Sequence, residues 1–353
     1  MKKLIAALLC LTALGAFADE KSEKAAADLL HRRLANEKPE EAALLKSVQG
    51  KDIVVVAGEM DHIESVLRAT GVPFTLIQPS QVADFQLKAN MAVMVNCPGT
   101  MPDAGVQRIA RFVRAGGLLY TTDWALQSVI EKAFPGTIAA NGEMTASEVV
   151  PVSIDKASDN LMSSVLLRKA SQPQWWLEGG SFPIKILDPK KVEVLASSPQ
   201  MAKSYGAGPV VVRFRWEDGE VVHVVSHFYR QLDAQGPAVA AAQAVNSFEG
   251  LSDADKRAFA KSEGGGTSVG NVESSYAFQR MTSNLLTGKQ KRNEELDRTY
   301  GFTSTTTLAL PSAPPRPAKE AKLRVLERKK DKTLVRDDEG NEGWVDSASL
   351  IAR

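Results

Sequence analysis

The feature that most constrains the fold is an alternation between short apolar runs and helical segments of about ten residues. Asp52–Ala57 (DIVVVA) is continuously apolar after its first residue, which is typical of a strand buried on both faces of a parallel sheet. Similar strands are expected at Phe74–Ile77, Met91–Asn96 and Leu118–Thr122. The helix expected over Asp103–Arg114 precedes a Gly-Gly pair. This pattern predicts an α/β domain, a parallel sheet with helices on both faces.

The second half of the chain departs from this alternation. Glu217-Asp218-Gly219-Glu220 separates Val210–Trp216 from Val221–His227, and an Asp-Gly between two β-rich runs predicts a tight hairpin. We therefore expect an antiparallel hairpin addition to the sheet. Further strands are expected at Ile184–Leu187 and Val192–Ala196, a loop at Glu263–Gly270, and helices at Glu23–Val48 (broken at Pro39), Asp61–Thr70, Gln81–Lys88, Trp124–Phe134, Asn160–Arg168, Gly236–Phe248 and Ser274–Tyr300.

The first residues match a secretory signal peptide. Met1-Lys2-Lys3 is basic, Leu4–Leu14 is apolar, and Ala16-Phe17-Ala18 offers small residues at the cleavage positions, so cleavage is expected after Ala18. The alternative is a retained anchor, but the apolar run is shorter than the roughly 20 residues that a bilayer span needs. We therefore expect a periplasmic or secreted protein with no membrane span, in which Cys97 is the remaining thiol.

Composition excludes several classes of protein. The 353 residues are 44% hydrophobic and 24% charged, with 43 basic against 42 acidic side chains. This balance argues against nucleic acid as a partner, and two cysteines make no disulfide framework. No Cys/His cluster has zinc spacing, and Gly264-Gly265-Gly266 does not follow an expected strand. We therefore expect no cofactor and no metal.

The C-terminal segment of the chain resembles the second half of a bacterial SH3-like barrel, because the turn Asp338–Asn341 is followed by Gly343-Trp344-Val345. The resemblance implies a cell-wall binding module; the alternative is a hairpin docked on the main domain. The expected division is a signal peptide (1–18), an N-terminal helical segment (19–50), the α/β domain (51–235), a helical extension with a Gly-rich loop (236–310), a Pro-rich linker (311–318) and a small all-β tail (319–353).

Polar residues follow four of the expected strands. In an open α/β sheet, ligands bind outside the carboxyl ends of the strands, so these residues predict one site. They are Glu59, Asp61 and His62 after the first strand, Asn96, Cys97, Pro98 and Gly99 after the third, Thr122, Asp123 and Trp124 after the fourth, and Ser226 and His227 at the end of the hairpin.

Residues 51–230 resemble the class I glutamine amidotransferase-like fold, a flavodoxin-like α/β domain, and especially its non-amidotransferase relatives of the trehalose-utilisation type. The likeness rests on Ile53–Ala57, Asn96-Cys97-Pro98-Gly99, Phe112–Leu119 and Ser226-His227. The family's working enzymes carry Gly-x-Cys-x-Gly at a strained turn after the fourth strand. They also follow their histidine with Pro-Glu, which orients the imidazole.

This sequence departs from both motifs. Thr121–Ala125 has neither a thiol nor a glycine, and His227 is followed by Phe228-Tyr229. The chain is therefore not expected to be a functional glutamine amidotransferase.

The candidate catalytic residues are Cys97, Asp123 and His227. A cysteine beside His227 or His62 would have a lowered pKa, but free cysteines are often buried, and an inert core thiol is the preferred interpretation. Asp123 with His227 would make an acid–base pair or half of a metal site. The preferred alternative for Asp123 is a cap on the helix that follows it.

Adjacent tryptophans stand out in the segment Gln174–Gly180. In a strand, Trp175 and Trp176 would point to opposite faces, so the outward ring could stack on a sugar or peptide while Glu178 accepts hydrogen bonds from hydroxyls. The alternative is that both rings are core anchors. His223 is flanked by valines and is expected to be a core histidine.

These observations favour an exported cell-envelope binding or scaffolding protein on a catalytically degenerate domain, with Asp61, His62, Asn96, Trp124, Trp175, Trp176 and Glu178 as ligand-binding residues. Its partner would be cell-wall glycan, peptide or another envelope protein. The alternative is an envelope hydrolase that uses Asp123 and His227, with or without Cys97, on a small substrate. The alternative requires these two side chains to lie within about 3 Å or one water of each other, and a separation above about 8 Å would exclude it.

Overall fold

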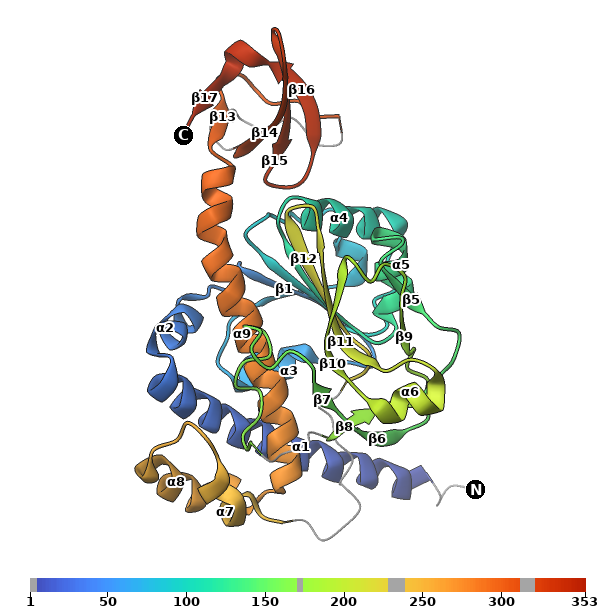
Figure 1. Ribbon diagram of the computed structural model, residues 1–353, viewed down its shortest axis with the longest axis vertical. Coiled ribbons are helices and arrows are strands. Elements are labelled where there is room, and N and C mark those ends of the chain that lie inside the picture. The colour runs from blue at the N-terminus through green and yellow to red at the C-terminus, as the bar shows by residue number, and fades with distance from the viewer. Residues whose placement is uncertain (1–4, 170–173, 228–238, 312–320) are drawn as a thin grey trace.

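The computed structural model describes residues 5–169, 174–227, 239–311 and 321–353, with the side chains of the first helix described from residue 20. The expected linker after Pro311 and the Phe228-Tyr229 pair lie outside these residues. An eight-stranded sheet forms the core, in the order β2-β1-β3-β4-β12-β11-β10-β7 (Figure 1). The parallel strands are β1 (Ile53–Val56), β2 (Thr75–Ile77), β3 (Ala92–Val95), β4 (Leu118–Thr122) and β12 (Gly219–Val224).

The antiparallel part of the sheet continues from β12. It consists of β11 (Pro209–Trp216), β10 (Val192–Ser197) and β7 (Ser153–Ile154), and the turn between β11 and β12 lies at Glu217-Asp218. Every residue of β1, β3 and β4 is buried, as their apolar sequences predict. The expected α/β class, with its hairpin addition, is confirmed.

Helices flank this sheet. The core side of α9 (Val269–Thr299) buries Phe278, Met281, Leu285 and Leu286. The Phe278 ring packs edge-on against Tyr120 of β4 with 6.1 Å between centroids. The other helices are α1 (Ile5–Glu37), α2 (Pro39–Ser47), α3 (Ile63–Ala69), α4 (Asp103–Arg114), α5 (Glu131–Ala133), α6 (Pro199–Tyr205), α7 (Ala241–Ala244) and α8 (Asp253–Ala260). Two short ribbons pair β5 (Ile138–Ala140) with β9 (Ile184–Ile186) and β6 (Glu148–Pro151) with β8 (Gln174–Leu177).

Three sequence predictions of local structure are wrong. The segment 160–168 forms turns, because Ser164 has φ +58° and the carbonyls of Leu161 and Ser163 accept hydrogen bonds from Asn284 of α9. The segment 81–88 has one short helical turn, Pro79–Gln81, in place of a helix. The expected Gly-rich loop holds a 3₁₀ turn, Glu263–Gly266, and the start of α9.

Helix α1 runs without a break past Ala18. Cleavage after Ala18 stays a prediction. Among the residues that the structure describes, no helix has both the length and the apolar character needed to cross a bilayer.

The C-terminal residues form a separate five-stranded antiparallel sheet in the order β16-β15-β14-β13-β17. Its first strand precedes the expected linker, so the sheet uses more of the chain than residues 319–353. Five buried side chains form its core: Leu308, Leu310, Ala321, Leu323 and Val335. The strands are β13 (Phe302–Ser304), β14 (Leu323–Lys329), β15 (Lys332–Asp337), β16 (Glu342–Asp346) and β17 (Leu350–Ala352). The SH3-like likeness stays a prediction.

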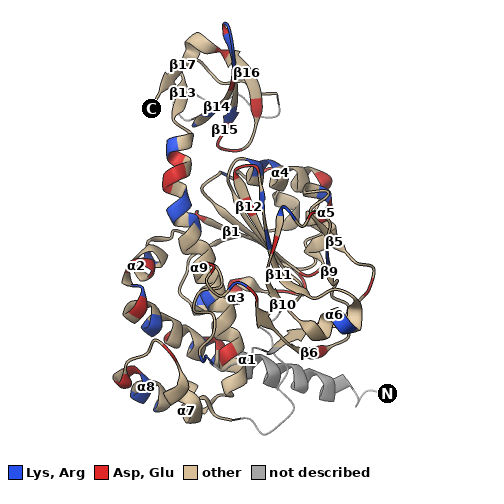
Figure 2. Ribbon diagram, in the orientation of Figure 1, with Lys and Arg blue, Asp and Glu red and all other residues tan. Residues whose placement is uncertain are grey.

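Charged side chains attach this small sheet to the α/β domain. Arg108 of α4 donates to Glu339 at 2.8 Å, and the two side chains are 7% and 9% exposed. Arg336 of β15 contacts Glu217 and Asp218 at the turn of the β11–β12 hairpin. Basic and acidic residues also alternate along the end of α9 that lies nearest the small sheet (Figure 2). Because Arg108 and Glu339 are both buried, loss of either side chain should destabilise the attachment of the small sheet.

The buried His223 predicts a pH dependence of stability. Its side chain is fully buried in β12 and lies 2.9 Å from the Thr121 hydroxyl, and burial lowers the pKa of His223 to about 3. Because the folded pKa lies below the unfolded value of about 6.5, the contribution to stability is complete above pH 6.5 and falls as the pH drops. His223→Gln should remove a slope of about 1.4 kcal/mol per pH unit between about pH 6 and 4. Urea unfolding at several pH values measures it, with His31→Gln as the control; an unchanged slope would contradict the prediction.

Candidate functional site

Four side chains from four strand ends meet at one edge of the sheet. Asp61 follows β1, Cys97 follows β3, Asp123 follows β4 and His227 follows β12, and each is at most 4% exposed. These strands are parallel neighbours in the sheet, so their carboxyl ends lie side by side. We call these four residues the acid cluster. The sequence placed all four at this edge, and the structure brings them together.

The loops after β1 and β3 are held together by their backbones. The N–H groups of Glu59 and Met60 donate to the Cys97 carbonyl at 3.1 and 3.2 Å. A Cβ at Gly58 would lie 2.3 Å from that same oxygen, so only glycine permits this approach. The close contact sets Asp61 and Cys97 on adjacent loops.

Asp123 occupies the turn that directly follows β4. Its φ is +47°, a left-handed conformation that costs a non-glycine residue free energy and recurs at functional sites. The turn after β4 is therefore strained at a residue that is not glycine. Its carbonyl accepts from the Leu126 N–H, while the π-helical turn that begins there (Leu126–Ile130) has no side-chain cap. The interpretation of Asp123 as a helix cap is wrong, because its carboxylate faces the cluster instead.

His227 is the centre of the acid cluster. Its Nδ1 lies 2.5 Å from Glu178 Oε2, and its Nε2 lies 3.8 Å from both Asp61 Oδ2 and Asp123 Oδ2. Asp61 also accepts a 2.5 Å hydrogen bond from the Thr122 hydroxyl. Glu178 thus orients the imidazole. It lies 49 residues before His227, directly after β8, and not next to His227 in the sequence.

Cys97 completes the cluster. Its Sγ lies 3.8 Å from Asp123 Oδ2, and a sulfur, an oxygen and a nitrogen of Cys97, Asp123 and His227 lie within 4.8 Å of one another. Asp61 Oδ1, Asp123 Oδ1 and His227 Nε2 are buried and have no hydrogen-bond partner within normal geometry among the described residues. These three residue types are ligands for a transition metal. Zinc spacing did not reveal them, because each comes from a different strand end.

Burial and charge shift the pKa values of the cluster in different directions. Burial raises the pKa of Asp123 to about 6. Burial also raises the pKa of the Cys97 thiol, although His227 and the Trp124 N–H oppose it. For His227, burial acts to lower the pKa, but Asp61, Cys97, Glu178 and Asp123 together raise it well above its ordinary value. These surroundings therefore favour the protonated forms of both the His227 imidazole and the Cys97 thiol.

Two residues predicted to bind a ligand, His62 and Asn96, both contact Glu64 of α3. His62 is turned away from the cluster, with its side chain 46% exposed and its Nδ1 3.1 Å from Glu64. Asn96 donates to Glu64 at 2.8 Å and accepts from the Ile63 N–H, which fixes the start of α3.

The three candidate tryptophans have different environments. Trp175 is 2% exposed, so it is a core anchor and offers no ring face to a ligand, while Trp176 is partly exposed and donates to the Ser147 hydroxyl. Trp124 is 43% exposed, lies next to Asp123 and donates to the Gly180 carbonyl at 2.8 Å. Its ring packs against the Phe182 ring, with 5.9 Å between the centroids. Trp124 is therefore a partly exposed aromatic ring whose residue adjoins the acid cluster in sequence.

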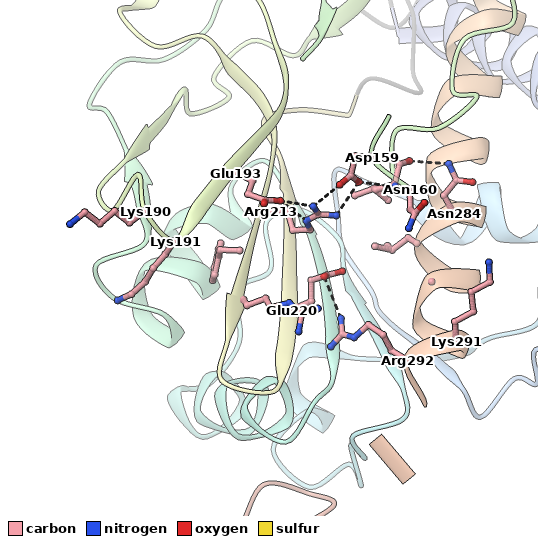
Figure 3. A pocket seen from close by; sticks show the side chains of 15 residues that line it. Asp159, Asn160, Lys190, Lys191, Glu193, Arg213, Glu220, Asn284, Lys291 and Arg292 are labelled. Carbon is pink, nitrogen blue, oxygen red and sulfur yellow. Dashed lines mark hydrogen bonds and ion pairs between the residues drawn. The ribbon is translucent and has the colours of Figure 1, made fainter. Parts of the chain in front are cut away.

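A separate charged pocket of about 670 Å³ lies between the β10–β11–β12 strands and α9 (Figure 3). None of the cluster residues lines it. Arg213 lies between Asp159 and Glu193, and Arg292 pairs with Glu220 at 3.3 Å. The ion pairs of Arg213 and Arg292 stabilise the wall of this pocket, so these two arginines have a structural role.

Comparisons with known proteins find only distant structural likenesses. No family model matches the chain, and no curated protein matches it. A ThuA-like protein from Bacteroides uniformis matches with 13% identity and a TM-score of 0.35, over 50% of this chain and 82% of that one. A cytoplasmic protein from Salmonella typhimurium matches with 10% identity and a TM-score of 0.37, over 59% and 96%. A beta-galactosidase from Bacillus circulans sp. alkalophilus has 11% identity and a TM-score of 0.39; the match covers 89% of this chain but only 43% of that one.

The environment of Cys97 predicts low reactivity. Because the thiol is 2% exposed and burial raises its pKa, iodoacetamide should label it at least about tenfold more slowly in the folded protein than in guanidinium. Mass spectrometry of the Cys97 peptide measures the two rates at pH 7.4. Equal rates would show that the thiol is accessible.

Proposed function

We propose that the chain is a hydrolase that acts on a small sugar-derived substrate at the acid cluster. One observation carries the proposal: His227 is held through Nδ1 by Glu178 while its Nε2 lies 3.8 Å from the Asp123 carboxylate. That distance is within the reach of one bridging water and far below the limit of about 8 Å that would exclude hydrolysis. The geometry thus favours the hydrolase over a purely scaffolding domain.

Buried ionisable groups without a structural partner support the same proposal. Carboxylates taken out of water lower stability unless they are paired or hydrogen-bonded. Asp61 and Asp123 each keep one oxygen without a hydrogen-bond partner in the described part of the chain. Asp123 also has a strained backbone. Such a combination is typical of a catalytic site.

The arrangement suggests how water would be activated. Asp123 and His227 hold a water between them, and the Asp61 carboxylate takes one of its protons. The water oxygen bonds to the electrophilic carbon of the substrate, and the bond to the leaving group breaks. The leaving group then departs with the proton from Asp61. Glu178 is a positioning residue, since it touches only the far side of the imidazole.

Trp124 suggests the substrate class. Its ring is 43% exposed beside the cluster and is fixed by Gly180 and Phe182. A fixed, half-exposed indole is a surface on which the apolar face of a sugar ring can stack. The substrate would therefore be a small glycoside or an acylated sugar.

Hydrolysis can be measured with purified full-length protein on 4-nitrophenyl glycosides, 4-nitrophenyl acetate and soluble peptidoglycan disaccharide fragments. Asp61→Asn and Asp123→Asn should each lower kcat by at least about 100-fold, because each removes a group that acts on the water. Trp124→Ala should raise KM and leave kcat nearly unchanged. Asp103→Asn, an exposed acid 87% open to solvent, is the matched control. Full activity of Asp61→Asn, or no hydrolysis of any of these compounds, would refute the proposal.

A second function, binding of cell-wall glycan by the C-terminal sheet, is favoured by Trp344 on β16. The indole is 44% exposed, and the Lys329 ammonium lies 4.7 Å from its ring centroid. An exposed aromatic ring with a neighbouring cation is a stacking surface for a glycan. The proposal also rests on the expected export of the chain.

Sedimentation with purified sacculi tests this second function. The wild-type protein should be retained, and Trp344→Ala should lower the retained fraction several-fold without disturbing the buried Arg108–Glu339 contact. Met144→Ala removes another exposed apolar side chain and should not change retention. Retention no greater than that of an unrelated protein would rule out wall binding.

A further inference from the structure

We infer that Cys97, Asp123 and His227 bind one divalent transition-metal ion of the Zn²⁺ class, with a fourth position open to water. The catalytic role of the ion rests on the proposed function, but its binding does not. Three protein ligands and one open position are the usual arrangement of a catalytic zinc site.

The distances between the candidate ligand atoms suit one small ion. Normal zinc–ligand distances in a tetrahedral site place two oxygen or nitrogen ligands about 3.4 Å apart and a sulfur–oxygen pair about 3.6 Å apart. Asp123 Oδ2 lies 3.8 Å from both His227 Nε2 and Cys97 Sγ. All three atoms lie within 4.8 Å of one another. Shifts of less than 1 Å would therefore close the three ligands around an ion.

The surroundings of His227 match those of a metal-binding histidine. Such a histidine almost always donates its other ring N–H to a carboxylate or carbonyl, which fixes the tautomer. Glu178 occupies this position at 2.5 Å from Nδ1. Nε2 is then left to face the cluster, where it is buried and has no partner of normal hydrogen-bond geometry among the described residues. Glu178 would be the residue that presents Nε2 to the ion.

The donor atoms also select the kind of ion. A thiolate and an imidazole are poor ligands for Mg²⁺ or Ca²⁺, which take oxygen ligands, whereas Zn²⁺ and Co²⁺ accept sulfur, nitrogen and oxygen together. A divalent ion would also offset the charge of the buried carboxylates. Asp61 is then the remaining acid, with Oδ2 3.8 Å from Nε2 and Oδ1 unpaired in the described structure. It would accept the proton of water on the ion, as in the proposed hydrolysis.

Co²⁺ titration of the chelator-stripped full-length protein tests this inference directly. One equivalent should produce the visible bands of a four-coordinate ion and the near-ultraviolet charge-transfer band of a cobalt thiolate. Cys97→Ser should abolish the charge-transfer band. In competition with a chromophoric chelator, His227→Ala should weaken Zn²⁺ binding at least about 100-fold and Glu178→Gln about 10–100-fold. His31→Gln, a histidine on α1 remote in sequence, should bind as the wild type does.

The outcomes separate this inference from the proposed hydrolysis. Stoichiometric binding with a thiolate band but no hydrolysis would support the metal site and refute the function. Full hydrolysis by metal-free protein, with no binding at micromolar Zn²⁺, would refute the metal site and support the function. Metal binding that is unchanged in Cys97→Ser and in His227→Ala would also refute the metal site. Far-ultraviolet circular dichroism and the Tm of each variant establish that it is folded.

Discussion

The crowding of carboxylates around the His227 imidazole constrains the edge of the sheet at which the acid cluster lies. Asp61, Asp123 and Glu178 approach His227 in a region from which solvent is nearly excluded. Such an arrangement is stable only if the imidazole carries a proton or if another cation takes that place. The same residues therefore make sense as an acid–base centre and as the ligands of a metal ion. A fold selected for stability alone would have apolar side chains here.

The architecture of the sheet explains why these groups meet. Neighbouring parallel strands bring their carboxyl ends to one edge, so residues far apart in sequence are adjacent in space. The backbone contacts between the loops after β1 and β3, and the left-handed conformation of Asp123, then fix the directions of the side chains. The position of the site follows from topology, and its chemistry follows from loop residues.

Much of this could be predicted from sequence where a regular pattern was present. The apolar runs gave β1, β3 and β4, and the Asp-Gly pair gave the β11–β12 turn, because burial and turn geometry act locally. The convergence of Asp61, Cys97, Asp123 and His227 followed from the same topology. The role of Glu178 could not be predicted, since β8 pairs with β6 in a ribbon outside the main sheet and no local pattern relates it to His227. The segment 160–168 was misassigned because tertiary hydrogen bonds from Asn284 override its helical tendency.

The buried contact between Arg108 and Glu339 has a consequence for how the two parts of the chain would work together. Separating the small sheet from α4 would break the 2.8 Å contact between these two buried side chains, and the Ala89 N–H, which donates to the Asp338 carbonyl at 2.7 Å, would lose its acceptor. The two parts should therefore tumble as one particle in solution. If Trp344 binds a glycan layer and the acid cluster is the proposed hydrolytic site, this attachment would hold the cluster at a fixed distance and orientation relative to that layer.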